Sequence, residues 1–201
     1  GGTSCGFREG GIKVVFALDT DADARETFGR NFPEVRCVCG DDITELDSRP
    51  VQSTLDSYPN ARVLFSGCAP CQPFTKQQTT KRSEDDRARL LTYFGELIAE
   101  HRPDLVFVEN VPGLQRVNGA FGPFPAFSKR LAELGYHSPG GRVVSAQDYG
   151  VPQQRERFIY IASLLGPIDF PAPTHGPGTG RAYATVRQWI EDLPALAAGQ
   201  E

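Results

Sequence analysis

The chain has 201 residues, which is enough for one domain with a sizeable hydrophobic core. Its apolar share of 39% and charged share of 23% are those of an ordinary globular protein, and no apolar run approaches the roughly 20 residues of a membrane span. The net charge of -4 argues against binding nucleic acid with the whole surface, and the odd number of cysteines argues against a disulfide framework and for a reducing interior.

Short β-rich runs alternate with helical stretches, which favours an α/β fold with a doubly wound, mostly parallel sheet and crossover helices. A stretch rich in proline and glycine at 167–180 is predicted to be a connector. The predicted strands are 13–18, 35–39, 62–66, 105–109, 137–143 and 157–161. The predicted helices are 21–31, 87–101, 126–134 and 185–193.

Glycines crowd the amino end and precede a strand that closes on Asp19. A glycine-rich turn lets the backbone approach a cofactor closely, and an acid at the end of the next strand can accept hydrogen bonds from ribose hydroxyls. The same glycines could form ordinary turns. They are Gly1, Gly2, Gly6, Gly10 and Gly11.

The next strand ends in Gly40, Asp41, Asp42 and Ile43. An acid followed by an apolar residue can bind adenine, because the carboxylate accepts from the exocyclic amine and the apolar side chain packs on the ring. A plain turn with a helix cap is the alternative, since Asp is a good capping residue.

Cys71 follows Pro70 on a turn after the apolar run 63–65, and Glu109 and Asn110 end another apolar run. Residues just past the carboxyl ends of buried parallel strands face the ligand crevice of an open α/β sheet. A thiol and a carboxylate are therefore predicted to face one pocket. This pairing suits a nucleophile that attacks a ring while an acid steadies the ring.

Other interpretations of these residues stay open. Cys71 could be a buried structural thiol, the commonest fate of a free cysteine. The C-x-x-C spacing of Cys68 and Cys71 also occurs in redox and zinc sites, with Cys37 and Cys39 as further ligands. Glu109 follows an apolar run, so it is predicted to be at least half buried, either as a proton donor to a ring nitrogen or as a structural carboxylate.

Two further groups carry positive charge. Arg155 and Arg157 are two residues apart, so they point the same way on an extended chain. Two guanidinium groups on one face suit a phosphate or a carbonyl-rich base edge. The mixed-charge stretch 75–90 is either a solvated loop or a contact to nucleic acid.

Together these motifs resemble one family, the DNA (cytosine-5) methyltransferases, over nearly the whole chain. The resemblance rests on GG…ALDTDADARETFGRNFP, CGDDI, SGCAPCQPFT, VFVENV and QQRER, which occur in the family's order. It implies a class I S-adenosylmethionine-dependent methyltransferase fold, with a catalytic domain at 1–166. Residues 167–201 would be the connector and the start of a target-recognition region.

The resemblance implies covalent chemistry on a cytosine that has swung out of the DNA helix. The Cys71 thiolate adds to ring carbon-6, and Glu109 hydrogen-bonds or protonates ring nitrogen 3. Carbon-5 then takes the methyl group of S-adenosylmethionine, which leaves S-adenosylhomocysteine. Arg157 would contact the cytosine carbonyl, and Arg155 would support the pocket or bind a phosphate.

The resemblance also assigns binding residues, and it implies no metal. Asp19 would bind the cofactor ribose, and Asp42 with Ile43 the adenine. Thr20 stands where the family usually has an aromatic residue that stacks on adenine. Gly2, Thr20, Pro70 and Leu90 complete the cofactor set, and Gln72, Thr75, Arg87 and Asn110 the set for double-stranded DNA.

The family's first strand and its target-recognition region find no counterpart in the sequence. We therefore expect the natural polypeptide to be longer at both ends, or a second chain to complete it, and residues 1–201 alone to be slow. The cell compartment would be the cytoplasm of a prokaryote or the nucleus of a eukaryote, with no membrane partner. Alternatives are an RNA cytosine-5 methyltransferase, a non-catalytic subunit of a split enzyme, and a cysteine-based metal module.

Overall fold

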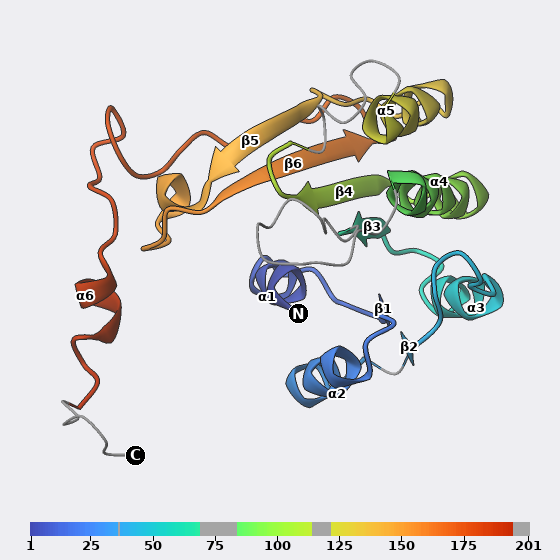
Figure 1. Ribbon diagram of the computed structural model, residues 1–201, viewed down its shortest axis with the longest axis horizontal. Coiled ribbons are helices and arrows are strands. Elements are labelled where there is room, and N and C mark those ends of the chain that lie inside the picture. Colours follow the sequence, from blue (N-terminus) through green and yellow to red (C-terminus); the bar gives the residue numbers. More distant parts are fainter. Residues whose placement is uncertain (36, 69–83, 114–121, 195–201) are drawn as a thin grey trace.

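The computed structural model describes residues 1–35, 37–68, 84–113 and 122–194 (Figure 1). It is an α/β structure, as the sequence predicts. The strands are β1 (Phe16–Leu18), β2 (Cys37–Cys39), β3 (Leu64–Gly67), β4 (Leu105–Asn110), β5 (Gly141–Ser145) and β6 (Glu156–Ser163). The helices are α1 (Gly2–Glu9), α2 (Ala22–Asn31), α3 (Arg49–Asp56), α4 (Glu84–His101), α5 (Pro123–Glu133) and α6 (Val186–Ile190), with a 3₁₀ turn at Ala146–Tyr149.

The strands form two sheets. In the first sheet β1 pairs with β2 in parallel, and the second is four-stranded in the order β3-β4-β6-β5. The prediction of parallel pairing holds for β1–β2 and β3–β4, whereas β6 runs antiparallel to both β4 and β5. Figure 1 shows the two-stranded sheet beside α2 and the larger sheet beside α4 and α5.

The hydrophobic core lies between the larger sheet and helices α4 and α5. Along β4 the buried residues alternate with partly exposed ones, so Val106 and Val108 face these helices. On the other face, Phe107 meets Phe7 of α1 edge to face at 5.4 Å. The helix side of the core is made by Leu91, Phe94, Ile98, Phe124, Phe127 and Leu131.

Two glycines are required by this packing. A Cβ added to Gly67, at the end of β3, would lie 2.7 Å from the ring of Phe94. A Cβ on Gly141, at the start of β5, would lie 2.0 Å from the ring of Phe158. Neither distance leaves room for a methyl group, so both rings pack directly on backbone.

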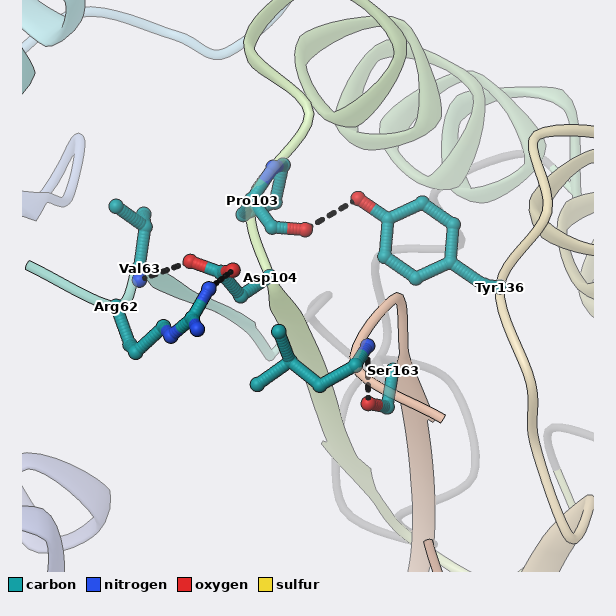
Figure 2. A network of polar contacts seen from close by, with 7 residues as sticks. Arg62, Val63, Pro103, Asp104, Tyr136 and Ser163 are labelled. Atoms are coloured by element: carbon teal, nitrogen blue, oxygen red, sulfur yellow. Dashed lines mark hydrogen bonds and ion pairs between the residues drawn. The ribbon is translucent and has the colours of Figure 1, made fainter. Parts of the chain in front are cut away.

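A network of polar contacts fastens the edge of the sheet where β4 begins, and Figure 2 shows it from close by. The Asp104 carboxylate accepts from the Val63 amide at 2.8 Å and from Arg62 at 3.0 Å. The Tyr136 hydroxyl donates to the carbonyl of Pro103 at 2.6 Å. These bonds tie the starts of β3 and β4 to the segment that follows α5.

Several elements differ from the sequence prediction. The glycine-rich start was predicted to be a turn, which is wrong for residues 2–9, because they form helix α1 with Gly1 as its cap, whereas Gly10 and Gly11 form a turn before β1. Gly2 and Gly6 do not prevent this helix, since the ring of Phe7 packs on Phe107 of β4. Helix α3 was not predicted, and β5 begins at Gly141 because Gly140 turns the chain with a φ of 86°.

The carboxyl-terminal segment leaves the sheet, and α6 stands apart from the other helices (Figure 1). Thr185 caps it through a capping box with Gln188, and none of its residues is buried. Within the described ranges, no helix combines the length and the apolar character needed to cross a membrane.

Candidate functional site

Three strands bring polar side chains together at one edge of the larger sheet. Cys68 directly follows β3, and Glu109 lies at the end of the neighbouring parallel strand β4. Arg157 lies near the start of β6, which runs antiparallel to β4. The thiol, the carboxylate and the guanidinium thus come from segments far apart in the sequence.

The Glu109 carboxylate is held from both sides. Its Oε1 lies 2.8 Å from Nε of Arg157, and its Oε2 accepts from Sγ of Cys68 at 2.9 Å. The side chains of Glu109 and Arg157 are 22% and 23% exposed, so the ion pair is largely shielded yet still reachable from solvent. The predicted burial of Glu109 is confirmed.

Strand register explains why Arg157 reaches Glu109. Glu109 pairs with Ile159 across the antiparallel ladder, so Arg157 is two residues along on the same face. Diagonal neighbours of this kind are close enough for long side chains to meet. On the other side, the parallel register pairs Gly67 with Val108, which places Cys68 beside Glu109.

Asn110 and Arg155 were also predicted near this edge, and the contacts seen for them are with main-chain groups. Asn110 is 2% exposed, and its side-chain oxygen accepts from the amide of Val111 at 2.8 Å, so it fixes the turn that leaves β4. Arg155 is exposed just before β6, and its carbonyl accepts from the amide of Ala146 at 2.9 Å. Arg157 therefore faces the Glu109 carboxylate, whereas Arg155 is exposed at the rim of the site, just before β6.

The predicted cofactor residues gather at the ends of β1 and β2. Asp19 and Thr20 are exposed in the turn after β1, where the Asp19 carboxylate accepts from the amide of Asp21 at 3.0 Å. Asp42 and Ile43 are partly buried in the turn after β2, where Oδ1 of Asp42 accepts from the amide of Thr44 at 2.9 Å. Because β1 and β2 are parallel neighbours, the two turns lie side by side.

The remaining predicted residues are scattered or lie elsewhere. Gly2 is exposed in the first turn of α1, and Leu90 is partly buried on α4. Arg87 lies on α4 as well, but its side chain is outside the described part of the chain. Outside the described residues lie Pro70, Cys71, Gln72 and Thr75.

Two contacts of the site were missed by sequence reasoning. Cys68 was considered only as a zinc or redox partner of Cys71, although its place at a strand end was the signal that also selected Glu109. The second contact is made by Arg25 of α2, which donates to the main-chain carbonyl of Asp19 at the end of β1. No sequence signal pointed to it, because the contact depends on how α2 packs against β1. In the part of the chain that the structure describes, no three His, Cys, Asp or Glu side chains are grouped as metal ligands.

The arrangement suits chemistry on a polar ring. A carboxylate beside a guanidinium can accept from a ring amino group, and in its protonated form it can donate to a ring nitrogen, while the guanidinium offers N–H donors to a ring carbonyl. Two acidic turns at the end of a second parallel pair suit a ribose and a base. These two areas are the ones that the sequence motifs selected.

The chain is similar to several known proteins, which are methylases or methyltransferases by name. A Herpetosiphon aurantiacus protein, Type II methylase M.HgiDII, is 36% identical over 99% of this chain and 53% of its own length. A Picosynechococcus protein, Type II methyltransferase M.AquIA, is 28% identical over 96% of this chain and 85% of its own length. A solved structure described as a DNA modification methyltransferase of an Escherichia coli prophage superposes with a TM-score of 0.76 at 25% identity, over 98% of this chain and 53% of that chain.

The chain thus spans about half the length of M.HgiDII and of the prophage protein. The superposed structure agrees with the class I methyltransferase fold expected from the motifs. The family model for C-5 cytosine-specific DNA methylases matches residues 1–175, and the chain belongs to that family.

Proposed function

We propose that the protein transfers a methyl group from S-adenosylmethionine to carbon-5 of cytosine in double-stranded DNA, through a covalent bond between Cys71 and carbon-6. The single observation that carries the proposal is the Glu109 carboxylate, fixed between Arg157 and Cys68 at the sheet edge where the Cys71 segment begins. Family membership supports a DNA substrate, and the Type II names of the relatives support a role in restriction-modification.

In this mechanism Cys71 supplies electrons to the cytosine ring, and Glu109 stabilises the negative charge that results. The thiolate forms the bond to carbon-6, and the displaced ring electrons make carbon-5 nucleophilic. Glu109 stabilises this charge by a hydrogen bond or a proton at ring nitrogen 3. After methylation a base removes the carbon-5 proton, the sulfur–carbon bond breaks, and the thiolate leaves.

Arg157 contributes position and charge. Its guanidinium holds one oxygen of Glu109 through Nε and keeps other N–H donors, which would meet the cytosine carbonyl. Arg155, exposed at the rim, would contact a DNA phosphate. By the family resemblance, Gln72 and Thr75 would contact the DNA, and Arg87 would meet a phosphate.

The residues at the ends of β1 and β2 fit S-adenosylmethionine by their chemistry. When bound, this cofactor supplies an electrophilic methyl group, and its transfer leaves a neutral thioether. The Asp19 carboxylate can accept from two ribose hydroxyls, and Asp42 with Ile43 can recognise adenine. Gly2, Thr20, Pro70 and Leu90 would surround the rest of the cofactor.

The lengths of the relatives support two arrangements for a target-recognition region. The chain covers 53% of M.HgiDII, so a target-recognition region in the same polypeptide is one arrangement. It covers 85% of M.AquIA, a relative of nearly its own size, so a second chain is the other. We propose that one of these supplies the residues that read the DNA sequence.

Trapping on DNA tests the proposal. With DNA that carries 5-fluorocytosine and with cofactor present, the longest natural form of the protein should form an adduct that survives denaturation. The fluorine cannot leave as a proton, so the bond to Cys71 persists. The adduct should vanish in Cys71→Ser and remain in the control Cys5→Ser, whose thiol lies on α1. Equal trapping by Cys71→Ser would refute the covalent step, and RNA carrying the same base tests the alternative substrate.

A further inference from the structure

Arg25 connects the two turns that the cofactor proposal uses. It lies on α2, and its NH1 donates to the main-chain carbonyl of Asp19 at 2.8 Å. Its guanidinium also lies against Gly40, at the end of β2. The side chain therefore reaches from the end of β1 to the end of β2, and it is partly buried there.

Gly40 makes room for this guanidinium. A Cβ built on Gly40 would lie 2.8 Å from Cζ of Arg25 and 3.1 Å from both Nε and NH1. Gly40 has no positive φ, so the backbone conformation does not by itself demand glycine. A side chain at position 40 would therefore have to displace the Arg25 guanidinium.

The contacts within each turn do not set the distance between the turns. Asp19 accepts from Asp21, and Asp42 accepts from Thr44, so each carboxylate organises its own turn. Between the turns, the Asp19 amide donates to the Cys39 carbonyl at 3.1 Å and so extends the β1–β2 ladder. Beyond this backbone bond, the Arg25 side chain connects the two turns through its contacts with Asp19 and Gly40.

We infer that Arg25 is a positioning residue for the adenosine half of the cofactor. It fixes the ribose-binding turn at Asp19 relative to the adenine-binding turn at 40–43, and so preorganises the site before binding. The inference rests on the proposed cofactor site. It assigns Arg25 no contact with the reacting atoms.

Binding of S-adenosylhomocysteine by calorimetry tests this role without requiring turnover. Arg25→Ala should raise the Kd about 10-fold, the effect of losing one hydrogen bond from a charged donor. Adenosine alone should lose the same factor, because only this half of the ligand lies between the two turns. Arg25→Lys should fall between, since it keeps a donor for the Asp19 carbonyl but loses the flat surface against Gly40.

Gly40→Ala supplies an independent route to the same defect, because its methyl group would displace the guanidinium. Gly40→Ala should weaken binding as Arg25→Ala does, and the double variant should be no weaker than either single one. Arg30→Ala is the matched control, because Arg30 lies on the same helix and pairs only with exposed Glu26 among the contacts seen. Its Kd should be unchanged.

The outcomes separate the inference from the proposed function. If the wild-type chain binds no S-adenosylhomocysteine, the cofactor site itself is wrong and the inference falls with it. If the wild-type chain binds and Arg25→Ala and Arg25→Lys bind equally well while folded, only the role of Arg25 is refuted. Additive losses in the double variant would refute the coupling to Gly40.

Discussion

At the scale of single residues, the carboxylate of Glu109 has both oxygens engaged, by Arg157 and by Cys68. A carboxylate held at two points keeps its orientation when a ring arrives, whereas one held at a single point can rotate. Cys68 thus has a use that does not require zinc or a disulfide. It would keep Glu109 aimed while Arg157 shares its charge.

We expect Cys68→Ala to slow 5-fluorocytosine trapping about 10-fold, because Oε2 of Glu109 loses its donor. DNA affinity should change little, since a neutral thiol makes no ion pair with DNA phosphates. Cys68→Ser keeps a donor and should restore most of the rate. A loss of DNA binding rather than of rate, measured by gel shift beside the trapping assay, would contradict this role.

At the scale of elements, the polar network at the start of β4 holds the sheet opposite the site (Figure 2). Tyr136 closes it by donating to the Pro103 carbonyl, while Asp104 gathers Arg62 and Val63. Burial raises the pKa of Tyr136 from 10.0 to about 12. The native state therefore keeps the neutral phenol at a pH where the unfolded chain has lost its proton.

This shift gives a pH dependence with a defined sign. The stabilising contribution of Tyr136 is fully present below pH 10.0 and is lost as pH rises towards the native pKa of about 12. We expect the free energy of unfolding, from urea titrations, to fall across that window. Tyr136→Phe should be less stable at neutral pH by about 1 kcal/mol and should show a shallower decline. An equal slope in both proteins would contradict the assignment.

Also at this scale, α6 presents apolar side chains to solvent. Val186, Trp189 and Ile190 are 56%, 63% and 50% exposed, and their spacing is that of one helix face. Leu193, which follows the helix, is 63% exposed. The family resemblance predicts that residues 167–201 contain the connector and the start of a target-recognition region, and this stays a prediction.

At the scale of the whole molecule, the two sheets differ in how well they are supported. Strand β4 has neighbours on both sides and a core behind it, whereas β1 and β2 are three residues each and pair only with each other in the described sheets. Two-stranded sheets of this length are marginal alone. The proposed catalytic site therefore lies on a better supported sheet than the proposed cofactor site.

We expect amide hydrogen exchange to report this difference. Amides of β1, at Phe16–Leu18, should exchange at least about 100-fold faster than those of β4, because local opening of the small sheet exposes little apolar surface. Saturating S-adenosylhomocysteine should slow amide exchange selectively in β1, since the bound molecule would bridge the ends of β1 and β2. Uniform protection across both sheets would contradict it.

The sequence by itself determined the class of fold, most elements and the motifs of the site. Apolar runs selected β3, β4 and β6, and the helix predicted from residue 21 agrees with α2, which Asp21 caps by accepting from the Ala24 amide. These features are local, since they depend on a few neighbouring residues. Cys71 was also selected in this way, and its role stays a prediction because it lies outside the described residues.

Only the tertiary structure decided which side chains meet. The antiparallel course of β6 brings Arg157 onto Glu109, and the fold of α2 brings Arg25 onto Gly40. It also made a helix of the glycine-rich start, through the contact of Phe7 with Phe107. Such contacts join residues far apart in sequence, and their energy exists only once the chain has folded, so no local pattern records them.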